Sequence, residues 1–140
     1  MIYLLDTNVV AELTTRPKPA PSVVEWARSV PATAHYLSVI TIAEIEAGVD
    51  ATPDPLRSVV LERILDGIRA EYQGRIAAIG EREASAYLTV HRRLKSTGTS
   101  VDPPDALIAA TAIANGWMLV SRNVKHLART GANVLNPWEY

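Results

Sequence analysis

Three carboxylic acids occupy positions from which they could act together on a phosphate ester. Asp6 directly follows a short apolar run, Glu44 lies about one helical turn after a second run, and Asp105 lies in the first turn of an apolar helix. An amide, Asn123, follows a third apolar run. Carboxylate oxygens and water are the ligands that Mg²⁺ and Mn²⁺ prefer. These residue types predict a divalent-metal site that can generate a hydroxide and stabilise charge on a phosphoryl oxygen.

Bringing the three acids together requires a partner, because like charges repel. Two carboxylates about 4 Å apart repel by about 4 kcal/mol at an effective dielectric constant near 20. A hard divalent cation removes that penalty, whereas zinc prefers nitrogen and sulfur ligands. We therefore expect Asp6, Glu44 and Asp105 to hold Mg²⁺ or Mn²⁺, and three carboxylates leave open whether one ion binds or two.

Each acid also has a purely structural interpretation. Asp6 can cap the helix that follows it. Glu44 can be the acidic member of a capping box with Thr41, and Asp105 can be a first-turn acid that the helix dipole favours, three residues after Asp102. Capping does not require the three acids to share one edge of a sheet. The structural interpretation is therefore weaker for all three together than for each alone.

The apolar runs that precede these residues predict strands and helices in alternation. We expect strands over 2–5, 35–40, 75–79, 117–121 and 134–135, and helices over 7–13, 21–29, 41–48, 56–72 and 81–97, with a further helix that Asp102 opens and Asn115 stops. The strands are continuous apolar runs, which is typical of a parallel sheet covered on both faces. This pattern predicts a three-layer α/β/α sandwich with a mainly parallel sheet. Polar side chains then meet in the crevice beyond the carboxyl ends of the strands.

The composition fits one domain of 140 residues and excludes several classes of protein. Hydrophobic residues make up 48% of the chain, which is enough for an ordinary core, and charged residues make up 21%. The chain has no cysteine, which excludes disulfides, thiolate metal sites and cysteine nucleophiles. Its net charge of -1 provides no global basic field for nucleic acid. No run is apolar enough for a membrane helix and no signal peptide is recognisable, so we expect a soluble cytoplasmic protein without a membrane partner.

Four segments and the C-terminal end carry motifs that follow one another over essentially the whole chain. They are Tyr3-Leu-Leu-Asp-Thr-Asn8, Ser38-Val-Ile-Thr-Ile-Ala-Glu-Ile-Glu-Ala-Gly48, Pro104-Asp-Ala-Leu-Ile-Ala-Ala-Thr-Ala112, Leu119-Val-Ser-Arg-Asn-Val-Lys-His-Leu127 and Gly131-Ala-Asn-Val-Leu-Asn-Pro-Trp138. In this order and spacing the chain resembles PIN-domain proteins, specifically the VapC-type toxin ribonucleases of type II toxin–antitoxin pairs and their FitB-like relatives. The resemblance implies a single PIN-like domain over residues 1–140.

The resemblance also implies an activity and its partners. The family's catalytic acids correspond to Asp6, Glu44 and Asp105, which would hold Mg²⁺ or Mn²⁺ in an endoribonuclease that acts as a toxin. A cognate antitoxin would bind the protein and block the site, and the substrate would be RNA. The family further implies a homodimer, for which helices 41–50 and 81–97 offer apolar faces.

Residues beside the acids have supporting roles in this interpretation. Thr7 and Asn8 match the residues after the family's first acid and would brace it. The family's fourth position is Asp or Asn, and Asn123 would orient water there without adding charge. Arg122 could hold a phosphate, although an ordinary surface arginine is as good an interpretation. Asp102 is either a reserve acid or a helix cap.

Two other functions compete with this one. A phosphotransfer enzyme can use an aspartate after its first strand, but a haloacid-dehalogenase-like enzyme needs a second aspartate where Asn8 stands. A receiver domain needs paired acids and a late lysine that are not well placed here. The alternative we retain is a catalytically weak PIN-like module that binds RNA or antitoxin.

Overall fold

A computed structural model describes all 140 residues and contains one five-stranded sheet. Every neighbouring pair of strands is parallel. The strand order is β3-β2-β1-β4-β5, so β1, the first strand in the sequence, lies at the centre of the sheet. The strands are β1 Tyr3–Leu5, β2 His35–Ser38, β3 Ile76–Ala77, β4 Met118–Val120 and β5 Val134–Leu135.

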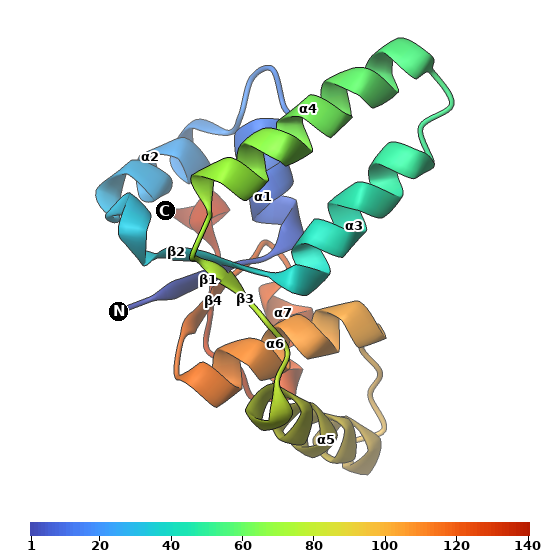
Figure 1. The fold of residues 1–140 in the computed structure, drawn as a ribbon. Helices are drawn as coiled ribbons and strands as arrows, with labels where there is room; N and C mark the ends of the chain where they lie inside the picture. Colours follow the sequence, from blue (N-terminus) through green and yellow to red (C-terminus); the bar gives the residue numbers. More distant parts are fainter.

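Helices cover both faces of this sheet, which confirms the predicted three-layer α/β/α sandwich. Figure 1 shows α1, α2 and α4 on one side of the sheet and α5 and α6 on the other, while α3 and α4 form a hairpin that projects from the body. The helices are α1 Thr7–Thr14, α2 Pro21–Ser29, α3 Val39–Asp50, α4 Pro55–Glu71, α5 Glu81–Ser96, α6 Pro103–Asn115 and α7 Val124–Leu127, with short 3-10 turns at Ala32–Ala34, Ala128–Thr130 and Pro137–Glu139.

Successive strand residues pack into opposite layers, which explains why the strands are apolar throughout. Leu5 and Val120 belong to the core beneath α1 and α2, whereas their neighbours Leu4 and Leu119 pack against α6. All four side chains are fully buried. A strand that buries both faces needs an apolar residue at every position. None of the helices combines the length and the apolar character needed to cross a membrane.

Most predicted boundaries differ from the structure by one or two residues, and two of them shift because a helix end takes residues from a strand. The strand predicted over 35–40 ends at Ser38, whose Oγ accepts a hydrogen bond from the Ile40 amide at 3.0 Å and caps α3. Thr41 therefore lies inside α3, and its predicted capping box with Glu44 does not form. Trp117 lies outside β4, because its amide bonds to the Ala112 carbonyl at 2.9 Å and closes the end of α6.

Candidate active site

The predicted site residues converge where three strands end and three helices begin. Asp6 follows β1 and caps α1, Glu44 lies in the second turn of α3 after β2, and Asp105 lies in the first turn of α6. Figure 1 shows the amino ends of α1, α3 and α6 at one edge of the sheet. The β4 strand ends at the same edge and is followed by Asn123. Parallel strands impose this arrangement, because all their carboxyl ends point the same way.

Asp6 is the most enclosed of the acids, with only 5% of its surface exposed. Its Oδ1 accepts the Thr7 amide at 2.8 Å, and its Oδ2 accepts the Ser121 hydroxyl at 2.7 Å and the Asn8 side-chain amide at 3.4 Å. Burial raises the pKa of Asp6, and the bonds from Ser121 and Thr7 act in the opposite direction by stabilising the carboxylate. Asp6 is thus both a helix cap and a fixed carboxylate at the edge of the sheet.

Ser121 is a site residue to which the sequence analysis gave no role. Its side chain is completely buried, and besides donating to Asp6 it accepts the Asn8 side-chain amide at 3.2 Å and the Asn123 backbone amide at 3.0 Å. One hydroxyl therefore connects the first acid to the residues after β4. The only signal in the sequence is a small hydroxyl residue directly after an apolar strand.

Glu44 is held by Thr7, the first residue of α1, which directly follows Asp6. The Thr7 hydroxyl donates to Glu44 Oε1 at 2.7 Å, and the hydroxyls of Thr7 and Thr41 are 3.1 Å apart. Because Thr7 has a single hydroxyl proton, Thr41 supplies the proton of their mutual bond whenever Thr7 donates to Glu44. Thr7 thus touches two acids, with its backbone on Asp6 and its side chain on Glu44.

Burial and the charges of the other acids affect the pKa of Asp105. Burial raises its pKa most, and the negative charges of Asp6, Glu44 and Asp102 raise it further, while His126 lowers it. Asp105 itself is only partly buried. Asp102 is exposed at the cap position of α6, and its side chain makes no capping hydrogen bond.

The two residues after Ser121 are exposed. The side chain of Asn123 makes no hydrogen bond to the protein and is free to bind water or a ligand. Arg122 donates its backbone amide to Asn8 Oδ1 at 3.4 Å, and its guanidinium lies over the Trp138 ring. Asn8 thus contacts Asp6, Ser121 and Arg122, and it links the first acid to the loop after β4.

The donor types at this edge fit a hydrated divalent cation. No group of three or more acidic, histidine or cysteine side chains lies close enough for all of them to hold one ion directly. Mg²⁺ keeps several waters and is usually held directly by only one or two carboxylates. Burial and then the charges of the neighbouring acids raise the pKa of Asp105, and a cation bound there would lower it.

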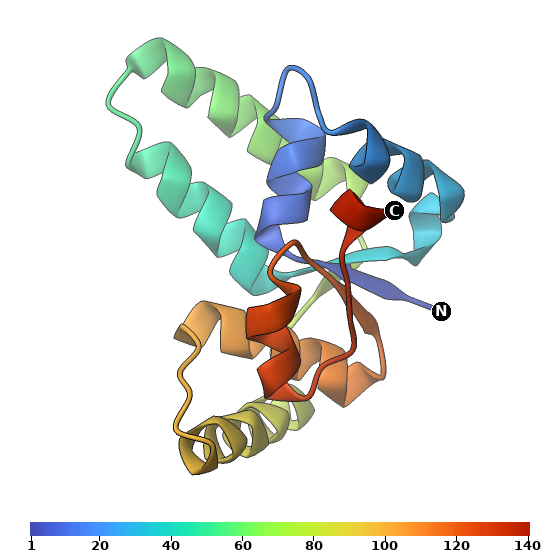
Figure 2. The ribbon, with the colours of Figure 1, turned by 180° about the vertical axis from the view of Figure 1, so that it is seen from behind.

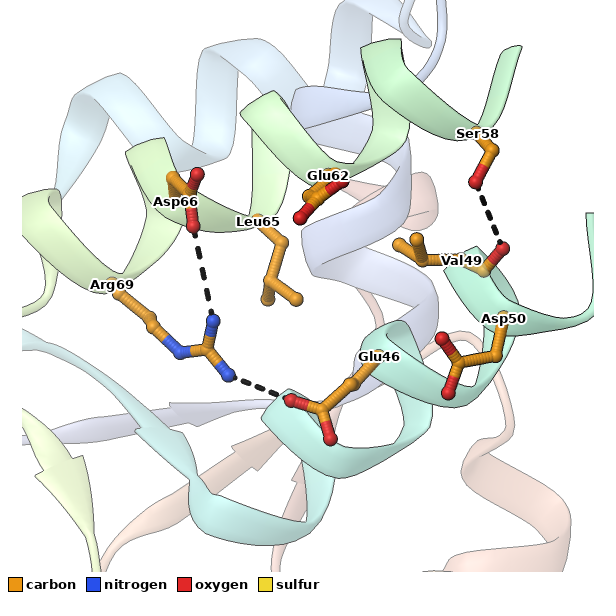
Figure 3. A pocket seen from close by; sticks show the side chains of 8 residues that line it. All are labelled: Glu46, Val49, Asp50, Ser58, Glu62, Leu65, Asp66 and Arg69. Carbon is orange, nitrogen blue, oxygen red and sulfur yellow. Dashed lines mark hydrogen bonds and ion pairs between the residues drawn. The ribbon is translucent and has the colours of Figure 1, made fainter. Parts of the chain in front are cut away.

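The acids line none of the three surface hollows, whose volumes are 360 to 390 Å³. One hollow lies between α3 and α4 and is rich in acidic residues (Figure 3). Its single basic residue, Arg69, already pairs with Glu46 at 2.9 Å and Asp66 at 3.9 Å. The candidate active site therefore lies at the edge of the sheet and outside these three hollows.

Comparisons with known proteins match nearly the whole chain. A model of the PIN domain family matches residues 3–133. The chain is 31% identical to VapC ribonuclease Y4jK of Sinorhizobium fredii over 99% of both sequences, and 35% identical to Toxin FitB of Neisseria gonorrhoeae over 98% of this chain and 99% of the relative. The crystal structure of FitAcB from Neisseria gonorrhoeae superposes with a TM-score of 0.91 at 33% identity, covering 99% of this chain and 100% of the other.

Proposed function

Because the chain belongs to the PIN-domain family, together with VapC- and FitB-type toxins, we propose that it is an Mg²⁺- or Mn²⁺-dependent endoribonuclease. The observation that carries the proposal is the convergence of Asp6, Glu44 and Asp105 on one edge of the sheet, where the first two raise the pKa of the third. An uncompensated cluster of carboxylates binds hard cations and suits phosphodiester hydrolysis.

The residues of the chain divide into those that would hold the metal and those that hold the acids. Asp6, Glu44 and Asp105 offer carboxylate oxygens to Mg²⁺ or Mn²⁺. The bound cation would neutralise phosphate charge and increase the acidity of an attacking water. Asn123 offers an amide with no charge, suited to orienting that water.

Hydrogen bonds from neighbouring side chains hold two of the acids in place. Ser121 and Asn8 donate to Asp6, and Thr7 donates to Glu44. Donors to a carboxylate favour its charged form, the form that binds a cation. The site is thereby preorganised before metal or substrate arrives, which is the general basis of electrostatic catalysis.

We further propose that the enzyme is a toxin inhibited by a cognate antitoxin. The relative in Neisseria gonorrhoeae is named Toxin FitB, and similarity to it covers nearly the full length of both chains. The open edge of the sheet gives an antitoxin direct access to the acids. A homodimer is part of the same proposal, and Leu88, an exposed apolar residue of α5, lies on one helix that offers a contact face.

A catalytically weak binding module is the second candidate. The observation that favours it is Asn123, which contributes no charge at the position where the resemblance to the family implies either Asp or Asn. Such a module would bind RNA or antitoxin through the same edge of the sheet but would not depend on Asp105.

The decisive experiment is cleavage of total cellular RNA by purified protein free of antitoxin, in Mg²⁺, Mn²⁺ or EDTA. Asp105→Asn should reduce metal-dependent cleavage by orders of magnitude, because the electrostatic and metal contributions dominate this chemistry. Asp54→Asn is the matched control: it makes the same change at an exposed helix cap, where asparagine caps equally well. Cleavage that survives both EDTA and Asp105→Asn contradicts the proposal, and binding without cleavage in any metal supports the binding module.

A further inference from the structure

Arg122, in the loop after β4, carries a positive charge that no acidic side chain neutralises in an ion pair. It follows the buried Ser121, and its backbone amide contacts Asn8, which also contacts Asp6. The ion pairs of the protein involve only Arg16, Arg69 and Arg75 as basic partners. The exposed guanidinium of Arg122 is therefore available to a ligand of opposite charge.

The guanidinium is held in place by an aromatic ring from the end of the chain. Its central carbon lies 5.0 Å from the centre of the Trp138 ring, within the range of a cation–π interaction. Trp138 is fixed in turn, because its amide bonds to Asn136 Oδ1 at 3.0 Å and its carbonyl accepts the Ser22 hydroxyl at 3.1 Å. Figure 2 shows this C-terminal turn beside α2, on the side of the sheet that carries α1.

We propose that Arg122, resting on Trp138, binds a phosphate of the RNA strand adjacent to the bond that is cleaved. This inference rests on the proposed ribonuclease function and assigns it a substrate-positioning pair. Stacking on a ring leaves the N–H groups at the edge of a guanidinium free, and their fork matches two phosphate oxygens. An RNA strand that approaches three carboxylates is repelled by them, and a fixed cation in the loop after β4 attracts that strand.

RNA fits this position better than an acidic segment of a protein partner. RNA presents a phosphate at every nucleotide, so whichever bond lies at the acids, another phosphate lies one nucleotide away. Planar bidentate recognition is also the feature that distinguishes arginine from lysine at phosphate sites. Arg122 is therefore a positioning residue that strengthens RNA binding. The acids, in contrast, take part in cleaving the phosphodiester bond.

The test measures RNA affinity and cleavage separately. A short fluorescein-labelled single-stranded RNA is titrated by fluorescence anisotropy against protein carrying Asp105→Asn, which prevents cleavage. Arg122→Gln in this background should weaken binding about tenfold, the loss of one charged contact, and should lower the salt dependence by about one phosphate contact. In the cleavage-competent protein the same substitution should raise KM about tenfold, with kcat changed less than about threefold.

Matched variants separate this role from charge and folding effects. Arg57→Gln removes the same charge from an exposed position at the start of α4 and should leave RNA affinity unchanged. Trp138→Phe should keep most of the affinity because it keeps a ring under the guanidinium, whereas Trp138→Leu should weaken binding toward the level of Arg122→Gln. Melting curves of each variant establish that the protein compared is folded.

Three results would overturn the inference. Equal RNA affinity of Arg122→Gln and Arg57→Gln, with wild-type cleavage intact, refutes the role of Arg122 and leaves the ribonuclease function standing. Unchanged RNA affinity together with loss of antitoxin inhibition assigns Arg122 to the protein partner instead. Absence of both RNA binding and cleavage in the wild-type protein refutes the ribonuclease function and this inference together.

Discussion

Replacing Ser121 by alanine should damage the site more than the loss of one small side chain suggests. The Ser121 hydroxyl is completely buried, and its 2.7 Å bond to Asp6 Oδ2 is a bond to a charged acceptor. Such bonds contribute about 1.5–3 kcal/mol. Two donors, the Asn8 side chain and the Asn123 amide, lose their acceptor at the same time. We expect Ser121→Ala to lower the free energy of unfolding by about 2–3 kcal/mol.

The same substitution should reduce kcat/KM for RNA cleavage by about 10- to 100-fold. Each 1.36 kcal/mol of transition-state stabilisation that is lost lowers the rate by about a factor of ten. It should also shift the acidic limb of the pH–rate profile to higher pH. Ser121 lowers the pKa of Asp6 against the effect of burial, so without Ser121 the carboxylate protonates at a higher pH. Urea denaturation and initial cleavage rates across pH measure the two effects.

Thr111→Ala is the control for stability alone. Thr111 is also completely buried, and its hydroxyl bonds to the Leu107 carbonyl within α6 at 2.8 Å, without contact to an acid. We expect a comparable loss of stability with wild-type cleavage at temperatures where the protein is folded. If Ser121→Ala cleaves RNA as well as Thr111→Ala does, Ser121 is only structural and our account of Asp6 is refuted.

Three further predictions concern metal binding, pH and the core. Mg²⁺ should raise the melting temperature of the wild-type protein, because a ligand of the folded state stabilises that state. In calorimetry the rise should be smaller for Glu44→Gln. An equal rise in both proteins would mean that the metal binds elsewhere. Burial and then the charge of Arg75 lower the pKa of His35, so the unfolded chain binds a proton more readily than the folded protein. The contribution of His35 to stability should therefore be complete above about pH 6.5 and fall as pH decreases through that value. In urea denaturation, the unfolding free energy of His35→Gln should depend less on pH. Ile108→Ala should cost about 2–5 kcal/mol of unfolding free energy, since Ile108 is completely buried, and a loss below about 1 kcal/mol contradicts its place in the core.

The sequence predicted the layers of the fold because apolar runs record burial on both faces. Each strand residue packs against one layer or the other, as Leu4 and Leu5 do, and this requires an apolar run without alternation. Element ends were less predictable. Ser38 and Thr41 are both good capping residues at the start of the same helix, and only the observed bond from Ile40 shows that Ser38 caps it.

The positions of the acids followed from topology, but their supporting contacts did not. A parallel sheet brings the residues after β1, β2 and β4 to one edge, so clustering was predictable from the order of elements. The bond between Ser121 and Asp6 joins residues 115 positions apart, and no local pattern predicts which side chain lies opposite another at that separation. The stack of Arg122 on Trp138 was equally hidden, because it depends on where the C-terminal turn packs.

The central position of β1 has a consequence for the timing of synthesis. The strand that carries the first acid leaves the ribosome first, yet its neighbour β4 comes near the end of the chain. Until β4 pairs with β1, Asp6 lacks its donor Ser121 and Asp105 has no fixed position beside it. A nascent or truncated chain that stops before β4 therefore has no assembled acidic centre. A protein built in this order has no complete acidic centre until its translation is nearly finished.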